Sequence, residues 1–217
     1  MNTKIRLTIL NFLEFAVWGA YLTSMGGYLA RVGLGAYIGY FYSIQGFVSI
    51  IMPALMGIVA DRWIQAQKVL SLCHFLAGSM MIAASLYCIQ VADNVDFPTL
   101  FALYSVSVAF FMPTIALANS VSYNALDKAG LDSVKAFPPI RVFGTVGFIV
   151  SMWIVDLSGW QTTSLQFLWS GILSIILALY SLTMPKCATN DSKTNSRIVQ
   201  ALGLEAFKLF RNYRMAL

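Results

Sequence analysis

Charged residues are scarce in this sequence. Only 11% of its 217 residues are Asp, Glu, Lys or Arg, whereas 59% are hydrophobic. A soluble domain is typically about half apolar and about a quarter charged. An apolar excess of this size does not fit inside the core of one soluble domain, so lipid has to cover part of it. The scarcity of charge therefore excludes an ordinary soluble domain and predicts a membrane protein.

Cysteine and histidine are also rare. The three cysteines, Cys73, Cys88 and Cys187, lie in or beside apolar segments without C-x-x-C spacing. We therefore expect free thiols, with no disulfide framework and no metal site. The single histidine, His74, is typical of a hydrogen-bonded residue inside a helix rather than of a catalyst. We expect no cofactor.

Recognisable catalytic motifs are missing too. The sequence has no Gly-x-Ser-x-Gly, no intramembrane pair of aspartates and no His-Glu-x-x-His. An intramembrane protease, which can also have six helices, is therefore disfavoured, and we expect no enzyme. The net charge of +5 does not indicate nucleic acid as a partner, because the cations lie in short segments between apolar runs instead of forming a patch.

Long apolar runs dominate what is present. A bilayer core about 30 Å thick requires roughly 20 apolar residues in a helix. Runs of this length do not alternate with a period of two residues, so helices are predicted rather than barrel strands. The sequence predicts an all-α membrane protein with six transmembrane helices, at about 7–30, 36–60, 69–91, 98–123, 137–156 and 164–185.

The distribution of Lys and Arg predicts the orientation. Of the 14 Lys and Arg residues, all but Arg31 and Arg141 fall in segments that lie on one side of the membrane if six helices cross it. Cytoplasmic segments are the ones enriched in Lys and Arg. The pattern predicts a multi-pass protein of the cytoplasmic (inner) membrane with both ends of the chain in the cytoplasm.

The composition changes after Pro185. Residues 1–185 are predicted to form the six-helix bundle, and residues 186–217 a cytoplasmic segment. Within that segment, 186–197 is polar and typical of a linker. Residues 198–211 have the apolar spacing of an amphipathic helix at the membrane surface. The last residues, from Arg214, read as the first turn of a seventh helix.

The first apolar stretch places four polar or aromatic residues at helical spacing, so that they share one face. A carboxylate at this depth costs about 2.5 kcal/mol or more unless it is protonated, paired or hydrated. The face is therefore interpreted either as the lining of a cavity with a proton-linked acid, or as a site of one interhelical hydrogen bond made by a protonated acid. The residues are Asn11, Glu14, Trp18 and Tyr21.

Two proline-containing stretches follow. In 98–123, Met112-Pro-Thr is expected to bend the helix. Asn119 is interpreted as a residue that hydrogen-bonds to a neighbouring helix more readily than as cavity lining. In 137–156, Pro138 and Pro139 are expected at the start of the helix.

Beyond these prolines, Arg141, Thr145 and Phe148 share one face, which offers a cation, a hydroxyl group and an aromatic ring. Such a face suits a nucleoside. By spacing alone, an Arg141 that extends to the cytoplasmic interface is an equal alternative.

Several stretches carry a resemblance to a known family. Gly57-Ile-Val-Ala-Asp61-Arg62, between the second and third predicted helices, resembles the loop motif of the major facilitator superfamily, although Ile64 replaces its usual later glycine. In that interpretation Gly57 permits close helix packing. The sequence as a whole resembles the nucleoside:proton symporter family of this superfamily, through the stretches that begin at Met52, Met112, Phe137 and Leu202.

The resemblance implies the N-terminal half of a twelve-helix transporter that takes up nucleosides with protons, with a C-terminal six-helix half as its partner. In this family the Arg, Thr and Phe of the helix-five stretch contact nucleoside, which implies Arg141, Thr145 and Phe148 here. Near Glu14 the family carries glutamine, so the carboxylate departs from the pattern. A sugar or oligosaccharide symporter of the same superfamily, or an inactive truncated fragment, is the alternative.

Overall fold

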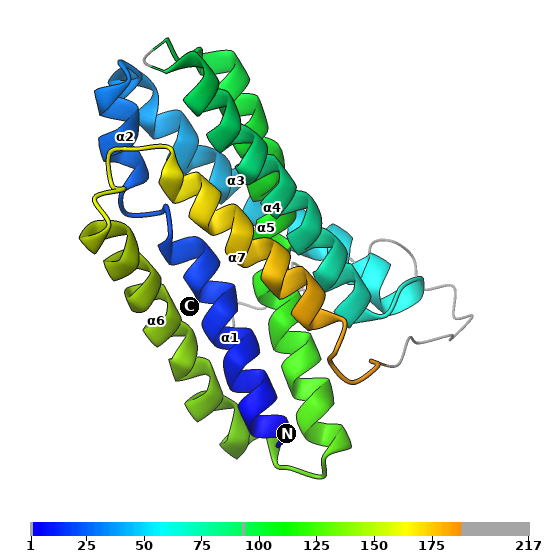
Figure 1. Ribbon diagram of the computed structural model, residues 1–217. Helices are drawn as coiled ribbons and strands as arrows, with labels where there is room; N and C mark the ends of the chain where they lie inside the picture. Colours follow the sequence, from blue (N-terminus) through cyan, green and yellow to red (C-terminus); the bar gives the residue numbers. More distant parts are fainter. Residues whose placement is uncertain (1, 93, 188–217) are drawn as a thin grey trace, which may run out of the picture.

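The computed structural model describes residues 2–92 and 94–187, and over these residues it is entirely helical (Figure 1). Helices form in each of the six predicted stretches. The elements are α1 (Thr3–Gly19), α2 (Met25–Arg31), a short 3-10 helix η1 (Gly35–Tyr37), α3 (Ile38–Arg62), α4 (Ala66–Val91), α5 (Phe97–Lys128), α6 (Ser133–Leu157) and α7 (Leu165–Ser181). The amphipathic helix predicted at 198–211 and the start of a seventh helix lie outside the described residues.

Four of these helical segments are long and apolar enough to cross a membrane. They are Gly35–Arg62, Ala66–Val91, Phe97–Lys128 and Ser133–Leu157. Helix α7 is apolar but shorter, with 17 residues. The chain is a multi-pass membrane protein, since helices of this length and composition find their lowest free energy across a bilayer.

The first predicted span is not one helix, which corrects the prediction of a continuous helix over 7–30. Helix α1 ends at Gly19, and α2 begins only at Met25, after a turn. The backbone N–H of Ala20 still bonds to the Ala16 carbonyl, which closes the last turn of α1. The intervening residues 20–24 include no charged residue, glycine or proline, so the sequence carries no strong signal of the break.

Helix α6 begins earlier than predicted. The Asp132 side chain accepts hydrogen bonds from the backbone N–H groups of Val134 and Lys135, which makes Asp132 the N-cap. Pro138 and Pro139 therefore lie inside the helix and not at its first position, so the expectation that they start it is wrong. The capping carboxylate sets the start of the helix, and the prolines follow within its first two turns.

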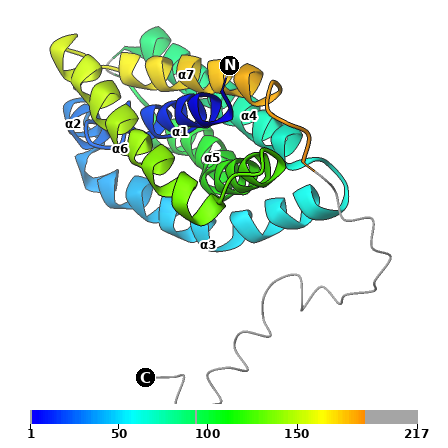
Figure 2. The same cartoon turned by 90° about the horizontal axis from the view of Figure 1, so that it is seen from below.

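The helices pack as two groups on either side of α1. Figure 2 shows α6, α5 and α3 on one side of the molecule and α4 and α7 on the other. Helix α1 packs along α6 and also contacts α7 and α5, while α4 packs along both α7 and α5. This arrangement leaves one face of the bundle formed by α3, α5, α6 and α1.

Glycines set the closest of these contacts. A Cβ atom at Gly147 of α6 would overlap the backbone carbonyl of Phe12 and lie 2.8 Å from its carbon atom. At Gly144, the added atom would lie 2.7 Å from the Phe15 ring. Small residues allow two helix backbones to approach in this way. Gly144 and Gly147 therefore form the strip of α6 against which α1 packs.

Basic side chains gather at the end of the bundle where α1 begins and α7 ends. At one end, the Tyr180 hydroxyl donates to the carbonyl oxygen of Arg6 at 3.1 Å, and the Lys128 ammonium donates to the carbonyl oxygen of Lys186. At the other end, the Arg31 guanidinium donates to the carbonyl oxygen of Thr162 at 2.7 Å. The start of α1 and the end of α7 therefore lie at the same, basic end of the bundle (Figure 1).

Candidate functional site

Arg141 and Thr145 lie in one hollow on the exposed face of α6. The hollow has a volume of about 370 Å³ and is lined by Phe137, Pro138, Arg141, Val142 and Thr145. Thr145 is exposed, and Arg141 is partly buried. The structure therefore brings the predicted cation and hydroxyl group together on a surface that α1 does not cover.

The guanidinium of Arg141 is held by an aromatic ring. Its central carbon lies 3.8 Å from the centroid of the Phe15 ring on α1. A guanidinium over a ring face is attracted by the ring quadrupole, by about 0.5–2 kcal/mol depending on exposure. In this position Arg141 packs against α1 at the edge of the hollow, and its contact with substrate, as against the membrane interface, stays a prediction.

Trp18 connects this face to the rest of the bundle. Its ring lies 6.3 Å from the ring of Phe148, edge to face, and 6.2 Å from that of Phe111. Its indole N–H donates to the Gln45 side chain at 3.2 Å. Phe148 is thus the third member of the predicted α6 face and packs directly against Trp18 of α1.

A second hollow lies on the other side of Trp18. It has a volume of about 460 Å³ and is lined by residues of α1, α3 and α5, namely Trp18, Gln45, Gly46, Ser49, Pro53, Met112, Ile115, Ala116 and Asn119. Asn119, which the sequence suggested mainly as a hydrogen-bonding contact between helices, lines this hollow. Gly46, Ser49 and Pro53 of α3 line it together with Trp18 of α1 and residues of α5. Three helices therefore contribute to the same surface.

Sequence reasoning missed Gln45. This amide is 8% exposed, accepts from Trp18 and donates to the Tyr104 hydroxyl at 2.7 Å. A single amide inside a long apolar run is costly unless it is paired, because lipid offers no hydrogen bonds. That cost was the signal in the sequence that could have identified it.

Two of the residues predicted on the α1 face do not line a hollow. Asn11 is fully buried and donates to the Leu7 carbonyl oxygen and to Ser122 of α5, at 2.9 and 3.3 Å. Tyr21 is also buried, with its ring 6.0 Å from that of Tyr104. The prediction that Asn11 and Tyr21 line a cavity is corrected, because both side chains are buried in the bundle. Asn11 joins α1 to α5, and Tyr21, in the turn after α1, packs against Tyr104 of α5.

Glu14 faces protein, as the cost of a carboxylate in lipid requires. It is 1% exposed. One carboxylate oxygen lies 2.8 Å from Nε2 of His74 on α4, and the other accepts from the Thr114 hydroxyl of α5 at 2.6 Å. Nδ1 of His74 lies 3.0 Å from the Ser174 hydroxyl of α7. Glu14 is therefore paired inside the bundle and not exposed in either hollow, and His74 is the hydrogen-bonded helix residue that the sequence predicted.

The loop-motif residues lie at the end of α3. Asp61 and Arg62 still belong to the helix, which ends at Arg62. A Cβ atom at Gly57 would meet open space, so the predicted close packing of Gly57 against another helix is wrong for the described residues. A conformational role of Gly57, Asp61 and Arg62 stays a prediction.

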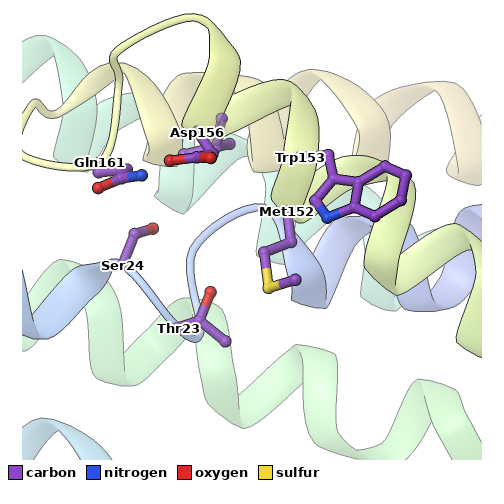
Figure 3. A pocket seen from close by; sticks show the side chains of 7 residues that line it. Thr23, Ser24, Met152, Trp153, Asp156 and Gln161 are labelled. Carbon is purple, nitrogen blue, oxygen red and sulfur yellow. The ribbon is translucent and has the colours of Figure 1, made fainter.

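A third hollow lies near the opposite end of α6 (Figure 3). Its volume is about 340 Å³, and Thr23, Ser24, Met152, Trp153, Val155, Asp156 and Gln161 line it. Asp156 is 15 residues from Arg141, which at about 1.5 Å per residue places it roughly 22 Å along the helix. This hollow is therefore separate from the Arg141 face.

The whole chain matches a known family. A family profile described as "Nucleoside H+ symporter" covers residues 1–217. The chain belongs to this family of nucleoside H+ symporters. The resemblance seen in the sequence is thereby confirmed.

Curated members of the symporter family are similar over the full chain. The xanthosine permease of Escherichia coli K12 is 44% identical over 100% of this chain and 51% of its own length. The nucleoside permease NupG of the same organism is 41% identical over 100% of this chain and 51% of its own length. The chain thus spans about half the length of the curated relatives it matches.

The fold of the symporter chain also matches solved structures. Superposition on a crystal structure of a point mutant of the nucleoside transporter NupG gives a TM-score of 0.88 with 40% identity, covering 99% of this chain and 52% of that one. A second NupG crystal structure gives a TM-score of 0.82 with 40% identity, covering 100% of this chain and 52% of that one. The all-helical, major-facilitator-type fold predicted from the sequence is confirmed.

Proposed function

We propose that this chain forms one half of a transporter that carries nucleosides and protons together into the cell. The observation that carries the proposal is the exposed face of α6, where Arg141 and Thr145 share a hollow and Phe148 packs against Trp18. Family membership and the similarity to nucleoside permeases support it. Transport, and not catalysis, is the proposed activity.

The chemistry of the α6 face fits a nucleoside. The Arg141 guanidinium is a strong donor to sugar or base oxygens, and Thr145 adds a hydroxyl contact. Phe148 and Trp18 offer apolar ring surface on which a planar base can pack. Substrate sites of secondary transporters lie near the bilayer midplane between two repeats. We therefore propose that a second six-helix half supplies the opposite wall, with lipid around both.

The division of the chain follows from the same proposal. We propose that residues 1–185 form the N-terminal half and that residues 186–217, most of which lie outside the described residues, follow it on the cytoplasmic side. The basic end of the bundle faces the cytoplasm, which is supported by the gathering of Arg6, Lys128 and Lys186 at that end.

This orientation is testable by labelling. A cysteine introduced at Gln161 should react with impermeant thiol reagents from outside the cell, whereas one introduced at Asp127 should react only after the membrane is permeabilised. Gln161 lies between α6 and α7 and Asp127 at the end of α5, so the two report opposite ends of the bundle. The reverse labelling pattern would overturn the orientation.

The substrate class is tested by competition. The complete transporter that contains this chain should bind a radiolabelled nucleoside, and unlabelled nucleosides should displace it. A disaccharide in the same excess should not, because the α6 face is built around one guanidinium and two aromatic rings rather than many polar groups. Displacement by the disaccharide and not by nucleosides would favour the sugar symporter instead.

A further inference from the structure

The buried group formed by Glu14, His74, Thr114 and Ser174 has no part in the substrate wall described above. These four side chains come from four helices, α1, α4, α5 and α7, and each is at most 1% exposed. A hydrogen-bonded chain runs through them, from Thr114 to Glu14 to His74 to Ser174. A titratable pair at the centre of a membrane bundle is expensive to bury, which makes it a candidate for function.

The contacts of Ser174 limit where the hydrogens of the pair can lie. Its hydroxyl lies 3.0 Å from Nδ1 of His74 and 2.9 Å from the carbonyl oxygen of His74. A serine hydroxyl has one hydrogen, and a carbonyl oxygen only accepts. If Ser174 donates to the carbonyl, it must accept from an Nδ1–H group. The 2.8 Å contact between Nε2 and the Glu14 carboxyl oxygen then needs a second hydrogen.

That second hydrogen gives a neutral pair. It lies either on Nε2, as imidazolium and carboxylate, or on the carboxyl oxygen, beside neutral imidazole, and both arrangements carry no net charge. When this proton leaves, Ser174 turns its hydroxyl to donate to Nδ1, and His74 donates from Nε2 to a Glu14 carboxylate. The pair then carries one negative charge, and the 2.9 Å contact to the carbonyl oxygen of His74 loses its hydrogen.

The Thr114 hydroxyl can also change its hydrogen-bond acceptor. Its hydroxyl reaches two acceptors at 2.6 Å, the Glu14 carboxyl oxygen and the carbonyl oxygen of Phe111. It donates to Glu14 when that oxygen is a carboxylate, and to Phe111 when the carboxyl group is protonated there. Two hydroxyl groups therefore adapt to the gain or loss of a proton by rotation alone, without displacement of a helix.

The pair lies close to the substrate wall. Phe15, which follows Glu14 in α1, holds the Arg141 guanidinium. A negative charge on Glu14 would attract the Arg141 guanidinium. Cys73 precedes His74 on α4, α5 and α7 contribute the hydroxyl groups of Thr114 and Ser174, and Arg141 comes from α6. Arg141 is the one cation among them.

We propose that Glu14 and His74 form an exchangeable proton site that controls how Arg141 binds substrate; this rests on the proposed nucleoside site. With the proton bound, the pair is neutral and Arg141 is free to donate to a nucleoside. With the proton released, the negative pair attracts the guanidinium towards α1, which competes with substrate. Proton and nucleoside therefore favour each other's binding, and by linkage the effect is reciprocal.

Access to the proton site is closed in this structure. The Phe111 ring lies between the pair and the hollow beside Trp18, at 6.1 Å from the His74 ring and 6.2 Å from that of Trp18. We infer that a rotation of the Phe111 side chain would connect the pair to that hollow, because its ring packs between His74 and Trp18.

The test measures nucleoside binding to the purified complete transporter over a range of pH. The parent should lose affinity by about tenfold per pH unit on the alkaline side of the titration, as expected for one linked proton. Glu14→Gln keeps the size of a protonated carboxyl group, so its affinity should stay at the acidic-pH value throughout. Cys73→Ala, beside His74 but outside the hydrogen-bonded chain, should retain the slope of the parent.

His74→Gln provides a second variant if Glu14→Gln does not fold, and it should move the slope along the pH axis, because the Glu14 carboxyl group then lacks its imidazole partner. A slope that persists unchanged in both variants, or a parent without any slope, overturns the proton site but leaves the nucleoside site standing. If the parent binds no nucleoside at all, the proposed function fails instead. The proton site is then judged by infrared spectroscopy: a protonated-carboxyl band that titrates in the parent and is absent from Glu14→Gln supports it, and a parent without that band contradicts it.

Discussion

Replacing Arg141 by alanine is expected to weaken nucleoside binding to the complete transporter by about ten- to a hundredfold. Loss of a hydrogen bond from a charged donor costs about 1.5–3 kcal/mol, and each 1.4 kcal/mol is a factor of about ten in affinity. The guanidinium lies on the Phe15 ring beside an open hollow, so its removal changes the site without opening the helix packing. Equilibrium binding on purified, folded protein measures the effect.

Arg141→Lys separates this account from an arginine that only anchors the helix at the interface. Lysine keeps the charge but lacks the planar guanidinium that lies on Phe15 and donates in a fixed geometry. We expect Lys to restore only part of the affinity. Parent-like binding by both the Ala and Lys variants would show that Arg141 does not contact substrate. Thr145→Val should cost less than Arg141→Ala, because a neutral hydroxyl makes a weaker hydrogen bond.

Gly147→Ala is expected to have the largest effect on folding. The added Cβ atom would overlap the backbone of Phe12, where neither helix has a side chain that can move away. Overpacking usually costs about 1–3 kcal/mol, and a backbone contact places this substitution at the upper end of that range. Separation of α1 from α6 would also disturb the contacts of Phe15 and Trp18 with the α6 face. Thermal unfolding of the purified protein measures the loss.

Gly39→Ala is the matched control. Gly39 also lies in a helix, but a Cβ atom there would meet no atom within 4 Å. Its stability should stay within about 0.5 kcal/mol of the parent, as for most exposed substitutions. Equal stability of the Gly147 and Gly39 variants would contradict the close packing of α1 against α6.

The helices were predictable because the bilayer imposes a length on apolar segments. The same reasoning could not locate the break after Gly19, because residues 20–24 include no charge, glycine or proline that would mark it. Pro138 and Pro139 misled the prediction for a different reason. A preference for the first helical turn is a local tendency, and the carboxylate of Asp132 starts the helix earlier by accepting two backbone N–H groups.

The candidate site was likewise predictable only in part. Arg141, Thr145 and Phe148 lie on one face of one helix, so their spacing grouped them, and the family resemblance is what proposed their role. The pairing of Glu14 with His74 joins residues 60 positions apart, and that of Trp18 with Gln45 joins residues 27 apart. Helical spacing carries no information about which helices become neighbours. Only the packing of α1 between the two groups of helices brings these partners together.

One measurement tests the central claim most directly: the movement of protons when nucleoside is added to proteoliposomes that contain the complete transporter. The account predicts that nucleoside makes the weakly buffered external medium more alkaline, that a disaccharide does not, and that Arg141→Ala needs about ten to a hundred times more nucleoside for the same signal. Nucleoside uptake without any proton movement, or a proton signal produced equally by the disaccharide, would contradict it.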